Sequence, residues 1–245
     1  PQLYEFENNT EWLPRGDFTF LGEPLLGGWL SWSSHSMAGY AQLNQAAPPN
    51  VAGDLFDPLP YYADRNGGLA MSRHELSAPL NFGPFNLVPY VWGEAAGWSN
   101  SFTGEGIDRL VGSVGVRGSI QFAKYMPWVQ SRIFGLNGLA HKMVFDLDWS
   151  LTESNRSLAD IPQWNEFDDN AQERFRQRLL MNTFGGTLPA QFDPRSYAVR
   201  SGAGSSVTAP WHELVDDLHV IRLGWRNRWQ TKVGPLERQR VKDWM

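Results

Sequence analysis

Residues 107–122 read Ile-Asp-Arg-Leu-Val-Gly-Ser-Val-Gly-Val-Arg-Gly-Ser-Ile-Gln-Phe, with apolar and polar side chains in alternation. This period of two predicts an extended strand, because successive side chains of a strand point to opposite faces. Strands of soluble domains usually have about 5–6 residues, whereas a tilted strand that crosses a bilayer needs about 9–11. The length of the alternation therefore favours a strand of an outer-membrane β-barrel.

Other segments of the chain also suggest strands. The same alternation recurs at residues 139–152, 171–184 and 218–232. A hairpin is predicted from residues 69–80 and 85–99, joined around Asn81-Phe82-Gly83-Pro84. A more ragged strand is expected over residues 28–43. Before it we expect only short extended pieces, because Pro14 and Pro24 interrupt them.

The connections between these strands differ in length. Residues 125–138 read as a connection, and long polar loops are expected near residues 46–66, 154–169 and 185–210. No segment of useful length has a helical period. Short turns that alternate with long loops are typical of outer-membrane barrels, in which the turns are periplasmic and the loops extracellular.

We therefore predict an all-β fold, with roughly nine or ten long strands that form part of a larger antiparallel transmembrane β-barrel. Residues 1–245 are expected to belong to one barrel domain, with less regular strands over 1–80 than over 81–245. The sequence begins Pro-Gln-Leu-Tyr, without an initiator Met or a signal peptide, and stops inside an expected strand. We interpret it as a piece of a longer protein.

Composition is compatible with this fold. Only 42% of the 245 residues are hydrophobic, and no run of about 18 apolar residues could form a transmembrane helix. Barrel strands are apolar on one face only, so a mean hydropathy of −0.40 does not argue against a barrel. The 12 Trp residues suit interfacial aromatic girdles, and they equally suit a soluble β-domain that binds polysaccharide.

Charge and residue usage exclude several classes of function. A formal net charge of −5 makes nucleic acid an improbable partner. The chain has no cysteine, which excludes disulfides, thiolate metal sites and cysteine nucleophiles. Its five histidines do not have the spacing of metal ligands. We therefore predict no metal site and no cofactor.

The two faces of the alternating strands give the candidate site residues. A charged side chain on the lipid side costs roughly 2–4 kcal/mol near the bilayer midplane, so charged positions are expected to face the lumen. The predicted lumen-facing residues are Arg109, Arg117, Asp146, Asp148, Arg174, Arg176, Arg178, Arg222, Arg226, Arg228 and Lys232. The predicted lipid-facing residues are Leu110, Val114, Val116, Ile120, Phe122, Met143, Phe145, Leu147, Trp149, Ile221, Leu223, Trp225 and Trp229.

The lumenal arginines have two interpretations. They can form ion pairs across the lumen, for example with Asp146 and Asp148. Alternatively they can guide an anionic amphiphile or ion, because the planar guanidinium fork suits phosphate.

The sequence contains few residue patterns that are typical of a catalytic site. The pair Ser34-His35 and the triplet Ser72-Arg73-His74 bring serine near histidine in sequence, but neighbours in a strand point apart. We therefore predict no catalytic residue and no enzymatic activity. An enzymatic barrel would require a serine and a histidine at hydrogen-bonding distance.

Several segments, in order, resemble the LptD family of lipopolysaccharide-assembly outer-membrane proteins, also called organic solvent tolerance or OstA proteins. Residues 136–145, Leu-Asn-Gly-Leu-Ala-His-Lys-Met-Val-Phe, resemble the Leu-x-His strand start of that family. The other resembling segments are 83–90, 167–175 and 225–232, with Asp243-Trp244 after them. The resemblance covers residues 80–245. The proline that often follows the family's histidine is absent, and so are the cysteines that some members use.

The resemblance implies a large barrel that receives lipopolysaccharide from a periplasmic bridge and inserts it into the outer leaflet without bond chemistry. It implies an outer-membrane location, contact with outer-membrane lipid and a small lipoprotein plug in the lumen. Two other functions stay open from the sequence: a porin-like or other outer-membrane channel, and a soluble Trp-rich β-domain that binds polysaccharide.

Overall fold

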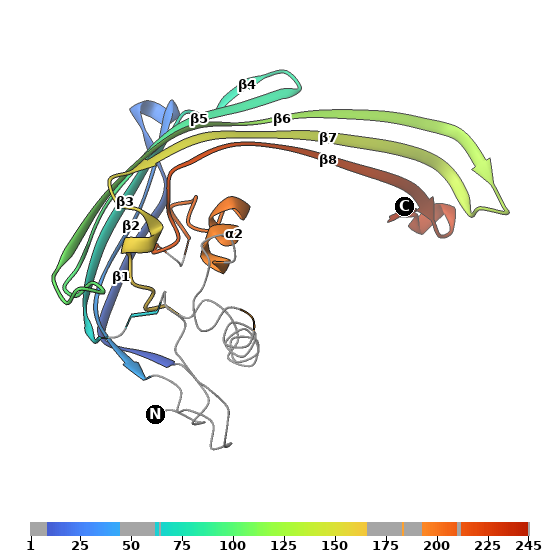
Figure 1. Cartoon of the computed structure of the whole chain (residues 1–245). Helices are drawn as coiled ribbons and strands as arrows, with labels where there is room; N and C mark the ends of the chain where they lie inside the picture. Colours follow the sequence, from blue (N-terminus) through green and yellow to red (C-terminus); the bar gives the residue numbers. More distant parts are fainter. Residues whose placement is uncertain are drawn as a thin grey trace, which may run out of the picture. The chain divides into compact units, whose positions relative to one another are not determined.

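The computed structural model describes residues 9–44, 62–63, 65–165, 183, 193–209 and 212–244. These residues form one open sheet of nine strands, mostly antiparallel, in the order β1-β2-β3-β5-β6-β7-β8-β9, with β4 paired to β5. The strands are β1 (Asn9–Leu25), β2 (Leu30–Asn44), β3 (Gly67–Ser77), β4 (Leu80–Phe82), β5 (Phe85–Trp98), β6 (Ile107–Ser131), β7 (Leu136–Ser154), β8 (Leu218–Val233) and β9 (Arg240–Asp243) (Figure 1). The predicted all-β class is confirmed.

Short helices occur between the strands of the described part of the chain. They are η1 (Leu26–Gly28), η2 (Leu158–Asp160), α2 (Pro194–Ser201) and η4 (Leu236–Arg238). The chain divides into two compact units. Unit 1 contains Pro1–Leu76, Val91–Ser113 and Leu151–Leu218, and unit 2 contains Ser77–Tyr90, Val114–Ser150 and His219–Met245.

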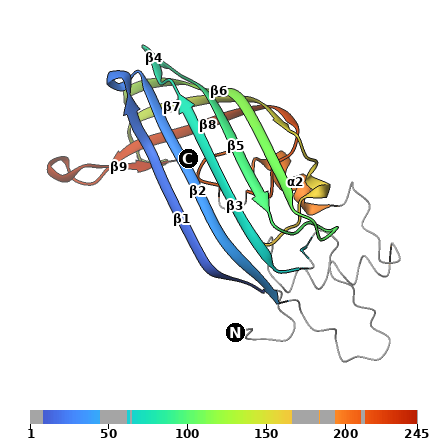
Figure 2. The same cartoon turned by 90° about the vertical axis from the view of Figure 1, so that its left-hand side faces the viewer.

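The predicted hairpin is confirmed, because Leu80, Asn81 and Phe82 of β4 pair with Leu87, Asn86 and Phe85 of β5. The predicted break-up of the N-terminal strand is wrong over residues 9–25, and residues 1–8 lie outside the described residues. β1 is one continuous strand of 17 residues, with irregular register between Trp12 and Arg15 and between Phe20 and Glu23. β1 is an edge strand, where prolines are tolerated because half of the backbone N–H groups need no ladder partner (Figure 2).

Two other boundaries differ from prediction. Residues 125–138 are not a connection, because β6 continues to Ser131 and β7 begins at Leu136. The expected loop 185–210 contains helix α2. Its ends carry ordinary helix signals: the Asp193 side chain accepts a hydrogen bond from the Arg195 N–H, and Gly202 ends the helix with a φ of 100°. Eight residues are too few for a helical period to stand out. The predicted strand 171–184 and the motif 167–175 lie outside the described residues.

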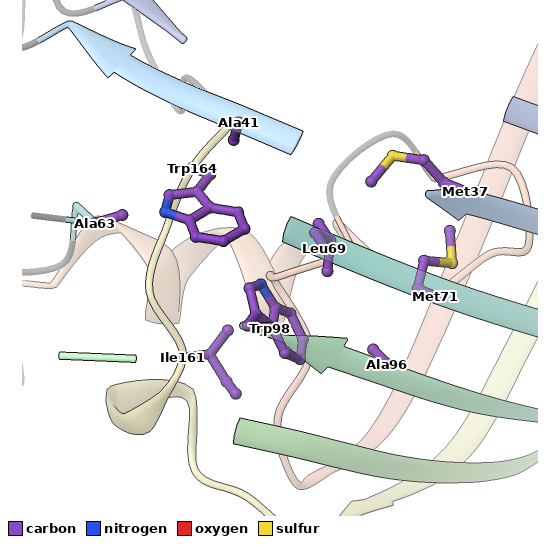
Figure 3. Close-up of a cluster of buried hydrophobic side chains, with 9 residues drawn as sticks. All are labelled: Met37, Ala41, Ala63, Leu69, Met71, Ala96, Trp98, Ile161 and Trp164. Atoms are coloured by element: carbon purple, nitrogen blue, oxygen red, sulfur yellow. The ribbon is translucent and has the colours of Figure 1, made fainter. Parts of the chain in front are cut away.

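The apolar core of unit 1 lies on one face of β2, β3 and β5 (Figure 3). Met37, Leu69 and Trp98 are buried there against Ile161 and Trp164, which belong to the chain that follows β7. The packing is close, since a Cβ added to Gly67 would lie 2.8 Å from the Trp164 ring. The segment after β7 therefore covers one face of the unit 1 strands.

In unit 2, β6 requires a glycine where β7 approaches it. A Cβ added to Gly115 would lie 2.5 Å from the Tyr90 hydroxyl and 2.6 Å from the Trp149 carbonyl oxygen. The Arg117 guanidinium lies over the Tyr90 ring, with its central carbon 3.8 Å from the ring centroid. The face of β6 that bears Gly115 and Arg117 is thus closely packed.

Candidate functional site

One face of the unit 1 strands buries charged side chains beside the apolar core, and the opposite face exposes apolar side chains. Arg73, Glu94 and Arg109 are 1%, 4% and 0% exposed, whereas Leu110 on the opposite face is 60% exposed and Val91 is 49% exposed. In a water-soluble sheet this combination is unfavourable, because burial of an unpaired charge is costly and exposure of a continuous apolar face to water is unfavourable. The buried charges therefore require counter-charges and hydrogen-bond acceptors close by.

Glu94 pairs with both arginines from the strands beside it. Its Oε2 accepts a hydrogen bond of 2.8 Å from Arg73 Nε, and its Oε1 accepts one of 2.5 Å from Arg109 Nη2. The two guanidinium groups also stack on tryptophans. Arg73 lies 4.6 Å from the Trp92 centroid, and Arg109 lies 5.1 Å from the Trp98 centroid. We call Arg73, Glu94 and Arg109 the buried ion cluster.

Backbone carbonyls of the segment before β8 complete the buried ion cluster. Arg73 Nη1 donates to the carbonyl oxygens of Gly204 and Ser206 at 2.6 and 2.7 Å. Arg109 donates to the carbonyl oxygens of His212 and Glu213. One carboxylate cannot satisfy the ten N–H bonds of two guanidinium groups, so these carbonyls supply the acceptors that burial otherwise removes. The cluster therefore fixes this segment to the charged face of unit 1, where Figure 1 shows α2 as well.

A histidine pair lies beside the cluster. The His35 and His212 ring centroids are 5.8 Å apart, and His35 Nε2 lies 3.3 Å from the Asp17 carboxylate. Both ring nitrogens of His212 are buried, and neither has a hydrogen-bond partner among the residues that the structure describes. Burial lowers the pKa of His212 below its ordinary value, because the imidazolium would lose its hydration there.

Unit 2 has a polar face of a different kind, with half-exposed ion pairs. Arg222 Nη1 lies 3.2 Å from Asp148, and Arg226 Nη2 lies 3.0 Å from Asp146. A pocket of about 490 Å³ runs along this face, and Arg117, Asp148 and Arg222 are among its lining residues. Ion pairs this exposed contribute roughly 0–1 kcal/mol each to stability. An anionic ligand can therefore replace the carboxylate partner of an arginine at little cost in free energy. We call this hollow the arginine pocket.

The other predicted lumenal residues are dispersed. Arg228 Nε is 3.9 Å from the Asp243 carboxylate, and Lys232 is exposed. Arg174, Arg176 and Arg178 lie outside the described residues. The structure thus brings together Arg117, Asp146, Asp148, Arg222 and Arg226 at the arginine pocket, and it places Arg109 separately in the buried ion cluster.

The thirteen predicted lipid-facing residues are all exposed or half-buried. Leu223 is 81% exposed, and Ile221 and Trp225 are each 65% exposed. Aromatic rings on this face contact one another rather than a second layer. Phe145 stacks on Trp225 with centroids 6.2 Å apart, and its edge meets Phe122.

Sequence reasoning missed two parts of the site. Glu94 interrupts an otherwise apolar face of its strand, and that interruption was the available signal for a charge partner. The argument against a serine–histidine contact was wrong for one pair. Ser72 and His74 are two residues apart, so they share a face of β3, and Ser72 Oγ lies 2.9 Å from His74 Nε2.

Comparisons with known proteins add no assignment: no protein-family model matches the chain, and no curated protein matches it. Among the described residues, no group of three or more His, Asp or Glu side chains is placed to hold a metal ion. No helix in those ranges combines the length and the apolarity that a membrane crossing requires.

Replacement of the central carboxylate should destabilise unit 1 strongly. Glu94→Gln removes the carboxylate that pairs with both buried guanidinium groups, so we expect a loss of about 3–5 kcal/mol in the free energy of unfolding. Urea unfolding followed by tryptophan fluorescence measures this loss. The control is Asp146→Asn, whose Arg226 partner is 74% exposed, and it should change stability by less than about 1 kcal/mol. Equal effects of the two variants would contradict the role of the cluster.

Docking of the segment around His212 should weaken in acid. Glu213 and Glu94 favour the imidazolium and Arg73 and His35 oppose it, but loss of hydration dominates. The pKa of His212 is therefore lower in the docked state than in the undocked state. Below about pH 6.5 the undocked state binds more protons than the docked state. Docking should be complete above that pH and should weaken as the pH falls.

The absence of cysteine allows a direct measurement of this docking. A fluorophore on Ser201→Cys, at the exposed end of α2, should report release of the segment between pH 7.5 and pH 5. His212→Leu in the same background should shift or flatten the profile. An unchanged profile would exclude His212 as its origin.

Proposed function

We propose that the chain forms part of an outer-membrane β-barrel that inserts lipopolysaccharide into the outer leaflet. The observation that carries the barrel is the exposed apolar face of its strands, opposite a face that in unit 1 buries charged side chains. Charged side chains such as Arg73 and Arg109 are buried, and apolar ones such as Leu110 and Leu223 are exposed. This distribution suits a wall with hydrocarbon on one side, because lipid solvates the apolar face and excludes charge from it.

The connections support the same proposal. Short connections follow β1, β4, β6 and β8, whereas the connections after β2 and β7 span residues 45–66 and 155–217. In outer-membrane barrels the short turns are periplasmic and the longer loops extracellular. The strands β6 and β7, with 25 and 19 residues, exceed the length that a tilted crossing requires.

The soluble alternative makes a different demand on the apolar face. A water-soluble polysaccharide-binding domain needs a second layer over the apolar face of β6, since an exposed patch of that size promotes association. Val114 and Phe122 are 45% and 47% exposed, without such a layer among the described residues. This exposure favours the membrane proposal.

The choice of lipopolysaccharide rests on the arginine pocket together with the resemblance to the LptD family. Lipopolysaccharide carries phosphate groups, and guanidinium groups bind phosphate through two parallel hydrogen bonds. In unit 1 the charged face is already occupied by the chain's own segment, from Gly204 to Glu213. We therefore propose unit 2, at Arg117 and Arg222, as the surface that contacts the anionic glycolipid. A plug lipoprotein and periplasmic bridge proteins are proposed as partners on the same resemblance.

A charge placed on the apolar face tests the membrane location. Leu223→Arg should lower the stability of the liposome-inserted protein by roughly 2–4 kcal/mol, because the guanidinium would enter hydrocarbon. Gln121→Arg is the control, since Gln121 is exposed on the polar face of β6. Unfolding in liposomes measures both. A soluble domain would tolerate Leu223→Arg without loss, since that side chain is already 81% exposed to water.

Photo-crosslinking tests the lipid. A photoreactive amino acid at Arg222 should capture lipopolysaccharide in liposomes that contain it, whereas the same group at Leu223, on the opposite face, should capture bulk lipid in proportion to its abundance. Absence of lipopolysaccharide capture at Arg222, together with ion-selective conductance in planar bilayers, would replace this proposal with a porin-like channel.

A further inference from the structure

A polar side-chain network lies on the apolar face of unit 1. Ser72 Oγ is 2.9 Å from His74 Nε2 and 2.7 Å from Ser36 Oγ. These side chains alternate with buried Arg73, so they share the face that bears Leu76 and Leu110, which are 40% and 60% exposed. Polar and ionisable groups on a surface that contacts hydrocarbon are costly, and they commonly mark a function.

The geometry of the network is that of an activated nucleophile. An imidazole nitrogen at hydrogen-bonding distance can take the hydroxyl proton as the serine oxygen attacks. The Ser36 hydroxyl can donate to Ser72 Oγ and thereby orient the Ser72 proton toward His74. Trp32 stacks on the His74 ring with an interplanar angle of 6° and a centroid distance of 5.9 Å, which fixes the plane of the imidazole.

A groove beside the network offers space for a substrate. It has a volume of about 690 Å³, and both Ser36 and Ser72 line it. Most of its other lining residues are small or apolar, among them Phe18, Ala38, Ala70 and Leu110, and the charged residues Asp108 and Arg109 also line it. The apolar part of this groove suits an acyl chain. Ser72 lines the groove, so its hydroxyl can contact the ester group of a lipid whose acyl chain is bound there.

We propose that Ser72 and His74 form a catalytic dyad that hydrolyses acyl esters of membrane lipids, with the acyl chain in this groove. The Ser72 oxygen attacks the ester carbonyl carbon while His74 Nε2 takes the hydroxyl proton. The bond to the alkoxy oxygen breaks, and the imidazolium protonates the leaving alcohol. Water, deprotonated by His74, then attacks the acyl-serine. A fatty acid leaves, and Ser72 regains its proton.

This activity goes beyond lipopolysaccharide insertion and does not require it. It needs only that the apolar face of unit 1 contacts acyl lipid. The ester can belong to a glycerophospholipid or to the lipid A part of lipopolysaccharide, because the dyad and the groove recognise only the chemistry that the two share.

The experiment uses the full chain folded in detergent micelles. A fluorophosphonate probe should label Ser72, as peptide mass spectrometry would show. Fatty acid release should be detected from mixed micelles of phosphatidylglycerol or, in a separate arm, from purified lipopolysaccharide. Release in either arm identifies the lipid source and supports the proposal. No labelling of Ser72 and no release in either arm would overturn it.

Variants distinguish a dyad from an incidental contact. Ser72→Ala and His74→Asn should each lower kcat by about 10²–10⁴-fold, and the double variant should be no slower, because the two groups act as a unit. Ser36→Ala, a change in a positioning residue, should lower kcat without a change in KM, and Ser36→Thr should restore it. Release that persists in Ser72→Ala would contradict the proposal.

The matched control is His141→Asn. His141 also stacks on a tryptophan of the apolar face, with its ring centroid 3.8 Å from that of Trp229, but its Nε2 contacts Asn227 rather than a serine. This variant should retain full activity. Lipopolysaccharide capture at Arg222 should also be unchanged in Ser72→Ala, so failure of the esterase and failure of the proposed function give different results.

Discussion

Glu94 joins two buried arginines, and the organisation of unit 1 depends on that carboxylate. Without it, two guanidinium groups would lie out of water and would lose the carboxylate that both contact, at a cost of several kcal/mol. With it, Arg73 and Arg109 have donors left over for the carbonyls of Gly204, Ser206, His212 and Glu213. The same ion cluster therefore stabilises the charged face of the sheet and attaches the segment that covers it.

The exposed apolar face opposite the buried ion cluster connects the fold to the proposed function. A sheet that hides its charges under its own chain and exposes leucine, valine and tryptophan needs an apolar environment on the exposed side. Among the described residues, the polar face of unit 2 offers the arginine pocket to anionic ligands. The apolar face of unit 1 carries the polar Ser36–Ser72–His74 network, and this network is why a second activity is proposed there.

Local alternation was enough to predict the strands at residues 69–99, 107–122, 139–152 and 218–232 and the division of their side chains between two faces. Alternation did not predict elements whose structure depends on their place in the sheet or on contacts between strands. The prolines of β1 broke the pattern but not the strand, because an edge strand needs fewer N–H donors. Helix α2 was too short to show a period. The partnership of Glu94 with Arg73 and Arg109 depends on the pairing of three strands, which no single segment encodes. The Ser72–His74 contact was predictable, since residues two apart in a strand share a face.

The central claim is that the apolar face of the strands contacts acyl chains while the opposite face does not. Single cysteines introduced along residues 114–122 of this cysteine-free chain, each with a nitroxide label, test it in liposomes. We expect the accessibility of the label to dissolved oxygen, which concentrates in hydrocarbon, to peak at Val114, Val116, Ile120 and Phe122. We expect minima at the alternating positions Arg117, Ser119 and Gln121. Equal accessibility of both sets to a water-soluble nickel complex would contradict it.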